Sequence, residues 1–123
     1  MALTIKWSTR RDLDEKSVNK LEDDLIGVYL LGYKDKEGKG HIMYVGKSEE
    51  DSLKSRLLAH ITNESNEKLS EKYSLYDCYF RFAEIPKKSI KDVEYTLYIL
   101  YNKPICNKNE PEGNKIEIVE EWP

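Results

Sequence analysis

The sequence lacks the cysteines, the long apolar stretches and the excess of basic residues that mark several large classes of protein. It has two cysteines in 123 residues, too few for the disulfide framework of a small secreted domain. No stretch approaches the roughly 20 apolar residues that cross a bilayer, so we expect no membrane partner. Charged residues follow soon after the first Met, which predicts no signal peptide and a cytoplasmic location with free thiols.

Positive and negative charges are nearly balanced. Lysine and arginine number 20 and aspartate and glutamate 23, so the net charge of -3 excludes a strongly basic protein that coats nucleic acid. Residues 111–123 carry four acids and one base, whereas residues 51–110 carry ten bases and nine acids. The middle of the chain could therefore present a local basic face. The two cysteines and two histidines lack the spacing of a structural zinc site.

The distribution of apolar residues predicts three strands. Leu25–Tyr33 and His41–Gly46 are rich in aliphatic and aromatic residues, and the short glycine-bearing loop between them predicts an antiparallel pair. Tyr76–Glu84 alternates between apolar and polar positions and predicts a third strand. The alternation over residues 115–120 is compatible with a fourth strand.

Helical spacing predicts the remaining elements. Apolar residues recur every four positions from Leu53 to Ile61, which predicts a helix over residues 52–61. Ser48 and Asp51 supply helix-start chemistry before it, and a polar stretch over residues 62–72 follows it. A more apolar helix begins after Ser89 and stops before Pro104, and residues 10–24 predict a short surface helix.

These elements together predict one small α+β domain, an antiparallel sheet of three to four strands covered by helices. We expect an N-terminal extension with a short helix over residues 1–24. The main domain is expected over residues 25–110, and an acidic tail or edge strand over residues 111–123.

Two side chains on the first long helix are suited to an anionic ligand. Arg56 and His60 are four residues apart, so one lies a turn above the other beside the apolar stripe. A cation and a titratable imidazole would then border the core. A surface arginine and a half-buried histidine without a ligand are the alternative interpretation.

Glu94 follows the core-facing Val93 in the most apolar helix of the chain. A carboxylate there needs a cationic partner, either Arg, Lys or a metal ion, because desolvating an unpaired charge is costly. An ion pair that serves stability alone is the alternative. Tyr29 and Tyr44 lie on the two predicted hairpin strands close to glycines, and such glycines mark places where a ligand or another backbone comes close.

Gly27-Val28-Tyr29, followed after a short loop by Tyr44-Val45-Gly46, resembles the paired signature of the GIY-YIG endonuclease family. The resemblance covers residues 25–109 and continues in the family's order with Arg56, His60, Glu94 and Asn107. Valine stands for isoleucine in both signatures, which keeps the β-branch. Many members carry tyrosine where His60 stands, and histidine there is similar to some restriction-type members.

The resemblance implies hydrolysis of a nucleic-acid phosphodiester at a single Mg²⁺ or Mn²⁺ ion. Glu94 would be the metal ligand and Arg56 would neutralise charge on the phosphorane. Tyr29 would be the general base, helped by Tyr44 or His60, although Tyr29 needs a lowered pKa for this role and His60 does not. Asn107 would hold a tyrosine or a water by hydrogen bonding.

We expect the substrate to be DNA, which includes branched or otherwise structured DNA. The residues near these positions, most of them basic, are the candidates for binding it. The basic residues are Lys47 at the end of the second strand and Lys87, Lys88 and Lys91 around the start of the Glu94 helix, and Gly46 before Lys47 is a further candidate. No appended DNA-reading module is recognisable, so specificity would come from DNA structure, a homodimer or a targeting partner protein. A catalytically silent module that binds nucleic acid or protein is the main alternative, and RNA as the substrate stays open.

Overall fold

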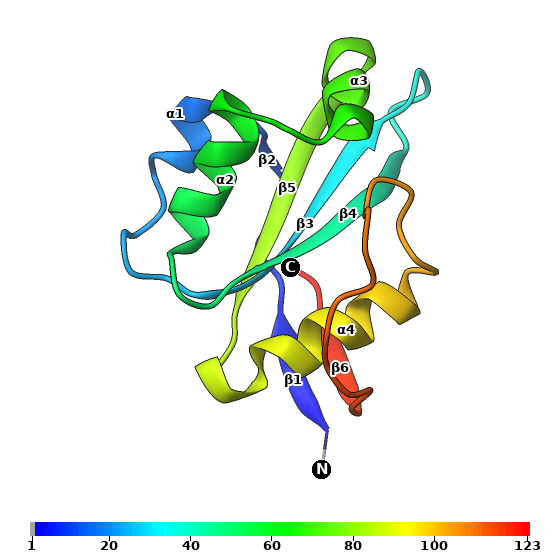
Figure 1. The fold of residues 1–123 in the computed structure, drawn as a ribbon. Helices are drawn as coiled ribbons and strands as arrows, with labels where there is room; N and C mark the ends of the chain where they lie inside the picture. The colour runs from blue at the N-terminus through cyan, green and yellow to red at the C-terminus, as the bar shows by residue number, and fades with distance from the viewer. Residues whose placement is uncertain (1) are drawn as a thin grey trace.

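The computed structural model describes residues 2–123, which form an antiparallel four-stranded sheet with helices on both faces and a separate parallel strand pair (Figure 1). The elements are β1 (Leu3–Lys6), β2 (Arg11–Asp12), α1 (Glu15–Val18), β3 (Gly27–Lys34), β4 (Gly40–Ser48), α2 (Leu53–Thr62), α3 (Glu67–Leu75), β5 (Asp77–Glu84), a 3-10 turn (Lys87–Ser89), α4 (Ile90–Leu100) and β6 (Ile118–Glu121). The main sheet has the order β2-β5-β3-β4 and the small one pairs β1 with β6. The predicted α+β class is confirmed.

The central strand β3 is buried on both of its faces because helices cover the sheet on each side. Successive side chains of a strand point to opposite faces. Val28 and Leu30 therefore join the core beneath α4, whereas Tyr29 and Leu31 join the core beneath α1 and α2. The near-continuous apolar sequence of this strand reflects that double burial.

The β3–β4 hairpin forms as predicted, with Tyr29 directly opposite Gly46. The ring of Tyr29 lies across Gly46, where an added Cβ would come 2.3 Å from the ring carbon Cζ. Glycine at this position therefore makes room for the tyrosine. Gly27 has a φ of +156°, and a Cβ there would meet the carbonyl oxygen of Ala83 on β5 at 2.0 Å. Close packing therefore explains why both Gly27 and Gly46 lack a side chain.

Two details of the helices differ from the prediction. The cap of α2 is Ser52, whose hydroxyl accepts a hydrogen bond from the Ser55 N–H at 3.0 Å, and not Ser48. The Ser48 hydroxyl instead accepts the Gly27 N–H at 3.3 Å. The polar stretch 62–72 also contains most of helix α3, which its weak apolar pattern does not reveal: Leu69 is the buried residue of that helix.

The first and last strands, β1 and β6, lie side by side below the main sheet (Figure 1). The last strand, β6, pairs with β1 in parallel, and the fourth strand of the main sheet is β2, paired with β5. Trp7 donates its indole N–H to Glu120 at 2.7 Å, and its ring stacks on Trp122 with centroids 5.7 Å apart. Residues before position 25 contribute to both cores, Ile5 and Trp7 to the one beneath α4 and Val18 of α1 to the one on the other face.

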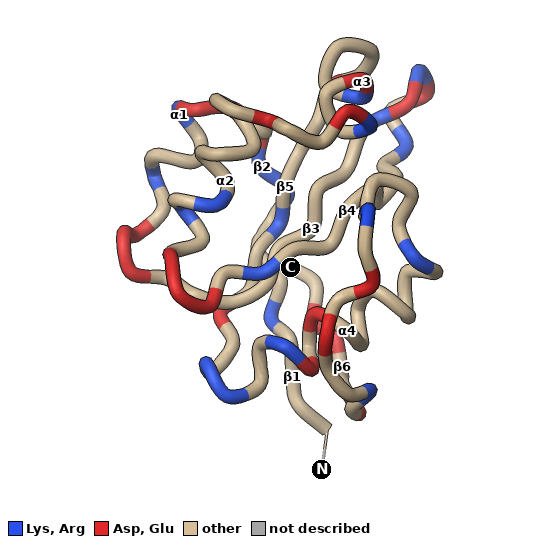
Figure 2. Tube along the Cα trace, viewed as in Figure 1, with Lys and Arg blue, Asp and Glu red and all other residues tan. Residues whose placement is uncertain are grey.

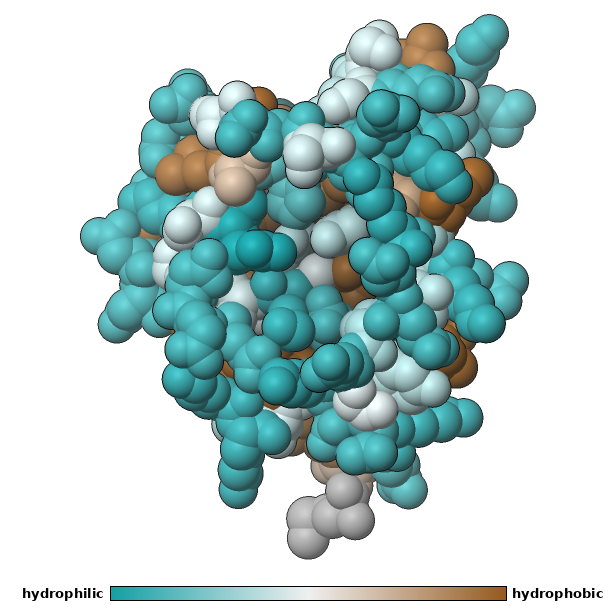
Figure 3. All heavy atoms as spheres, in the orientation of Figure 1, coloured by the Kyte–Doolittle hydropathy of each residue, from teal (hydrophilic) through white to brown (hydrophobic). Residues whose placement is uncertain are grey.

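The surface is mostly hydrophilic on the face that Figure 3 shows, as the balanced charge suggests. Within residues 2–123, no helix has both the length and the apolar composition that crossing a bilayer requires. Cys78 and Cys106 are both free thiols.

Candidate functional site

A cavity of about 380 Å³ opens between α2, α4 and the loop that follows α4. Five of the six predicted catalytic residues line it: Tyr44, Arg56, His60, Glu94 and Asn107. The sixth, Tyr29, has no exposed surface and lies behind the wall, with its hydroxyl 2.7 Å from Nε2 of His60. The structure therefore gathers all six residues in one region.

These residues converge because β4 is an edge strand of the sheet. Helix α2 packs on one face of the sheet and α4 on the other, and both contact β4. Arg56 and His60 approach the edge from α2, and Glu94 approaches it from α4. Tyr44 on β4 forms the wall between them, its ring centroid 5.3 Å from that of His60.

His60 is held through both nitrogens of its ring. Nε2 lies 2.7 Å from the Tyr29 hydroxyl, and Nδ1 lies 2.7 Å from Oε1 of Glu64. An ionised carboxylate can only accept hydrogen bonds, so Nδ1 carries the hydrogen that bonds Glu64. In the neutral imidazole Nε2 is then the acceptor, and the Tyr29 hydroxyl donates to it.

Glu64 and Tyr73 belong to this network although the sequence pattern did not identify them. Oε1 of Glu64 also accepts the Tyr73 hydroxyl at 2.6 Å, and Oε2 accepts the backbone N–H of Asn66 at 3.2 Å. The available signal was the spacing of four residues from His60 to Glu64. It was hidden because α2 ends at Thr62, so helical periodicity does not extend to Glu64.

The pKa values of Tyr29 and Tyr44 are both raised, whereas a tyrosine that acts as a base needs a lowered pKa. Burial, and then the neighbouring Tyr44, raises the pKa of Tyr29 well above its usual value of 10, while the Arg56 guanidinium opposes the shift. Burial also raises the pKa of Tyr44. Arg56 alone therefore does not produce the lowered phenol pKa that a tyrosine base needs, and Tyr29 is a hydrogen-bond donor in this structure.

Glu94 is a buried carboxylate without a direct partner. It is 8% exposed, and within residues 2–123 it makes neither a hydrogen bond nor an ion pair. Burial raises its pKa from 4.5 to about 7, although Lys47 and Arg56 oppose that shift. Among the described residues, therefore, no cation forms the stabilising ion pair that was the alternative interpretation of Glu94.

Such a carboxylate fits a divalent cation. Mg²⁺ prefers oxygen ligands, keeps several of its waters, and needs only one or two carboxylates beside a substrate phosphate. The described residues contain no group of three or more His, Cys, Asp or Glu side chains arranged to hold a metal. Glu64 and Glu110 also line the cavity, but Glu64 is already bonded to His60 and Tyr73, so Glu94 is the carboxylate that we consider as a metal ligand below.

Asn107 has a different partner from the one expected. Its side-chain amide donates to the Val45 carbonyl at 3.0 Å and accepts the Val45 N–H at 3.0 Å, so it bonds the exposed edge of β4 rather than a tyrosine. The neighbouring Cys106 N–H bonds the Met43 carbonyl on the same strand at 2.9 Å. Asn107 thereby fixes the loop that forms one wall of the cavity.

The predicted substrate-binding lysines lie beside the cavity rather than in its wall. Lys47 donates to Glu49 at 2.9 Å. That hydrogen bond, with the charges of Lys91 and Lys87, lowers the pKa of Glu49, so these three lysines gather at the end of β4. Lys88 is exposed on the turn before α4, where Figure 2 shows basic residues in blue. Among the lysines of the described residues, Lys108 is the one that lines the cavity itself.

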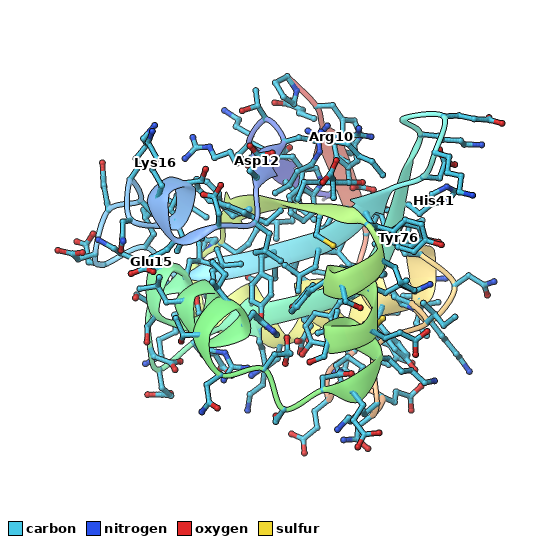
Figure 4. All side chains as sticks on the ribbon, turned by 90° about the horizontal axis from the view of Figure 1, so that it is seen from above. Arg10, Asp12, Glu15, Lys16, His41 and Tyr76 are labelled. Carbon is cyan, nitrogen blue, oxygen red and sulfur yellow. The ribbon has the colours of Figure 1, made fainter. Side chains whose placement is uncertain are left out.

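The second histidine, His41, lies at the far end of the hairpin. Its Nε2 bonds Asp35 at 2.8 Å, and its ring stacks on Tyr33 with centroids 5.0 Å apart. Figure 4 shows His41 near Tyr76, whose ring centroid is 4.5 Å from that of Tyr33. This aromatic group is separate from the residues that line the cavity.

Comparisons of the chain with models of known protein families, with curated proteins and with solved structures give no match. The function of the cavity is therefore inferred from the residues that form it and from their spacing in the sequence.

Proposed function

We propose that the chain is a divalent-metal-dependent endonuclease that hydrolyses phosphodiester bonds of DNA. The observation that carries the proposal is the cavity wall, where an imidazole and a phenol meet a guanidinium and a carboxylate that form no ion pair within residues 2–123. These are Arg56, His60, Tyr44 and Glu94. The order of these residues in the chain, which resembles the GIY-YIG family, supports the same conclusion.

Glu94 would hold the divalent ion. At neutral pH its carboxylate is close to its pKa of about 7, so a cation is needed to keep it ionised in its buried position. The bound ion would supply Lewis-acid stabilisation of the negative charge that develops on the phosphate.

Arg56 would bind the scissile phosphate opposite Glu94. It makes no ion pair within residues 2–123, so its charge is available to a ligand. A guanidinium can donate two parallel hydrogen bonds to phosphate oxygens. Its contribution should increase as the phosphate gains charge in the transition state.

His60 would be the proton acceptor. Tyr29 has no exposed surface and a raised pKa, so the proton of an attacking water must enter the network at a group that faces the cavity. Nε2 of His60 is the nitrogen of that network without a hydrogen, and it would take up this proton once the Tyr29 hydroxyl that bonds it has turned away. We expect His60→Gln to reduce cleavage about tenfold more than Tyr29→Phe, because general base catalysis is worth about 10²- to 10⁴-fold. A larger loss in Tyr29→Phe than in His60→Gln would instead assign the base to Tyr29.

Cleavage of supercoiled plasmid and of branched DNA with Mg²⁺ or Mn²⁺ tests the proposal. We expect divalent-dependent nicking by the wild type that Glu94→Ala abolishes. Glu84→Gln, which alters an exposed carboxylate at the end of β5, is the matched control and should keep full activity. Arg56→Ala should lower the cleavage rate strongly and DNA affinity less, as expected of an interaction that strengthens in the transition state.

The control for Arg56 is Lys16→Ala, which removes an exposed cation on α1 (Figure 4). DNA binding without cleavage by pure wild-type protein would support the binding-module alternative instead. Parallel assays with single-stranded RNA decide between the two nucleic acids. Nicking that Glu94→Ala leaves unchanged would refute the assignment of the metal site.

A further inference from the structure

We propose that Glu64 is a positioning residue that fixes the ring and the tautomer of His60, so that Nε2 faces Tyr29 as the proton acceptor. The catalytic part of this inference rests on the proposed nuclease function, because it concerns the same site. The hydrogen-bonding part rests on the structure alone.

The Glu64 carboxylate is fixed by groups other than His60. Its side chain is 10% exposed, so its charge needs compensation by hydrogen bonds. Tyr73 on α3 donates to Oε1 at 2.6 Å, and the N–H of Asn66 donates to Oε2 at 3.2 Å. Asn66 in turn caps α3 and donates its side-chain amide to the Cys106 carbonyl at 2.7 Å. The carboxylate is thus anchored to α3 and to the cavity loop.

This anchored carboxylate determines which nitrogen of His60 carries the hydrogen. Oε1 lies 2.7 Å from Nδ1, and a bare Nδ1 would direct its lone pair at a negative charge. The tautomer with the hydrogen on Nδ1 is therefore stabilised, and Nε2 keeps its lone pair for the Tyr29 hydroxyl. When Nε2 takes up a proton, the resulting imidazolium is paired with Glu64. A base oriented by a third group is a recurring arrangement in catalysis.

Tyr73 supports the role by occupying the second lone pair of Oε1. Burial, and then its hydrogen bond to Glu64, raises the pKa of Tyr73, so its hydroxyl remains a donor. The same three groups could form a buried network that serves stability alone. Such a network would still set the tautomer of His60 but would leave the rate of cleavage insensitive to the charge at position 64.

The test combines NMR of the two histidines with cleavage assays. Two-bond ¹H–¹⁵N spectra of uniformly labelled protein report the tautomer of His60 in the wild type, in Glu64→Gln and in Tyr73→Phe. We expect the hydrogen on Nδ1 in the wild type, a mixture of tautomers in Glu64→Gln and a smaller change in Tyr73→Phe. Cleavage should fall at least about tenfold in Glu64→Gln with DNA affinity nearly unchanged.

Glu71→Gln is the matched control, since it makes the same chemical change at an exposed position of α3. It should alter neither the spectra nor the rate. An Nε2-protonated His60 in the wild type, or an unchanged tautomer in both variants, would overturn the inference. A shifted tautomer with undiminished cleavage would overturn the positioning role. If the wild type cleaves no DNA, the nuclease proposal fails, whereas the spectra still decide whether Glu64 sets the tautomer.

Discussion

Replacing Glu94 with glutamine should make the metal-free protein more stable at neutral and alkaline pH. Burial raises the pKa of Glu94 from 4.5 to about 7, so the folded protein holds this proton more tightly than the unfolded chain does. The free energy of unfolding of the wild type therefore decreases as pH rises from about 4.5 to about 7. Glutamine mimics the protonated acid and does not undergo this loss.

The size of the effect follows from the pKa difference. A change from 4.5 to about 7, at about 1.36 kcal/mol per pH unit, corresponds to about 3 kcal/mol as an upper bound. Glu94→Gln should thus match the wild type near pH 4 and exceed it by up to about 3 kcal/mol at pH 8.

Urea unfolding in EDTA, followed by circular dichroism from pH 4 to pH 8, measures the difference between the two proteins. Adding Mg²⁺ or Mn²⁺ at pH 8 should then stabilise the wild type more than the variant, because a ligand that binds only the folded state adds to its stability. Glu84→Gln is the control and should show no such pH-dependent gain. Parallel stability curves, or a less stable Glu94→Gln at pH 8, would refute the reasoning.

Three further predictions concern stability. Gly46→Ala should destabilise the fold by about 1–3 kcal/mol in thermal or urea unfolding, because its Cβ would lie 2.3 Å from Tyr29 Cζ; unchanged stability would show that the ring moves freely. Asn107→Ala, measured in the same way, should cost about 1–3 kcal/mol through the loss of both bonds to Val45, and a neutral result would mean that water replaces them. Truncation after Glu110 should lower the unfolding midpoint markedly because it removes β6, whereas an unchanged midpoint would show that the β1–β6 pair is dispensable.

The sequence predicts the elements whose apolar pattern is strong. The hairpin, β5 and α4 follow from alternating or four-residue spacing, because their buried faces are continuous. Helix α3 escapes prediction since it buries little more than Leu69. The pairing of β6 with β1 is also not predictable, because a short alternating stretch shows no preference for a partner.

The candidate site is predictable to the extent that its residues lie within regular elements. Arg56 and His60 share a helix, and Glu94 is conspicuous in an apolar one. Glu64 and the Val45 contact of Asn107 depend on loops, and loop geometry has no sequence period. The direction of the Tyr29 pKa shift could not be predicted either, because it depends on complete burial behind Gly46 and His60.

The charges in the cavity favour a ligand over a purely structural role. A structural ion pair would bring Arg56 and Glu94 into contact, yet neither makes an ion pair within residues 2–123, although both line the same cavity. The unpaired Glu94 carboxylate should lower the stability of the folded protein at neutral pH. Because Arg56 and Glu94 line the same cavity without contacting each other, the cavity has room for a phosphate beside the guanidinium and a cation beside the carboxylate. The cost in stability that its ionised form imposes, with no ion-pair partner within residues 2–123, supports our proposal that Glu94 binds a cation.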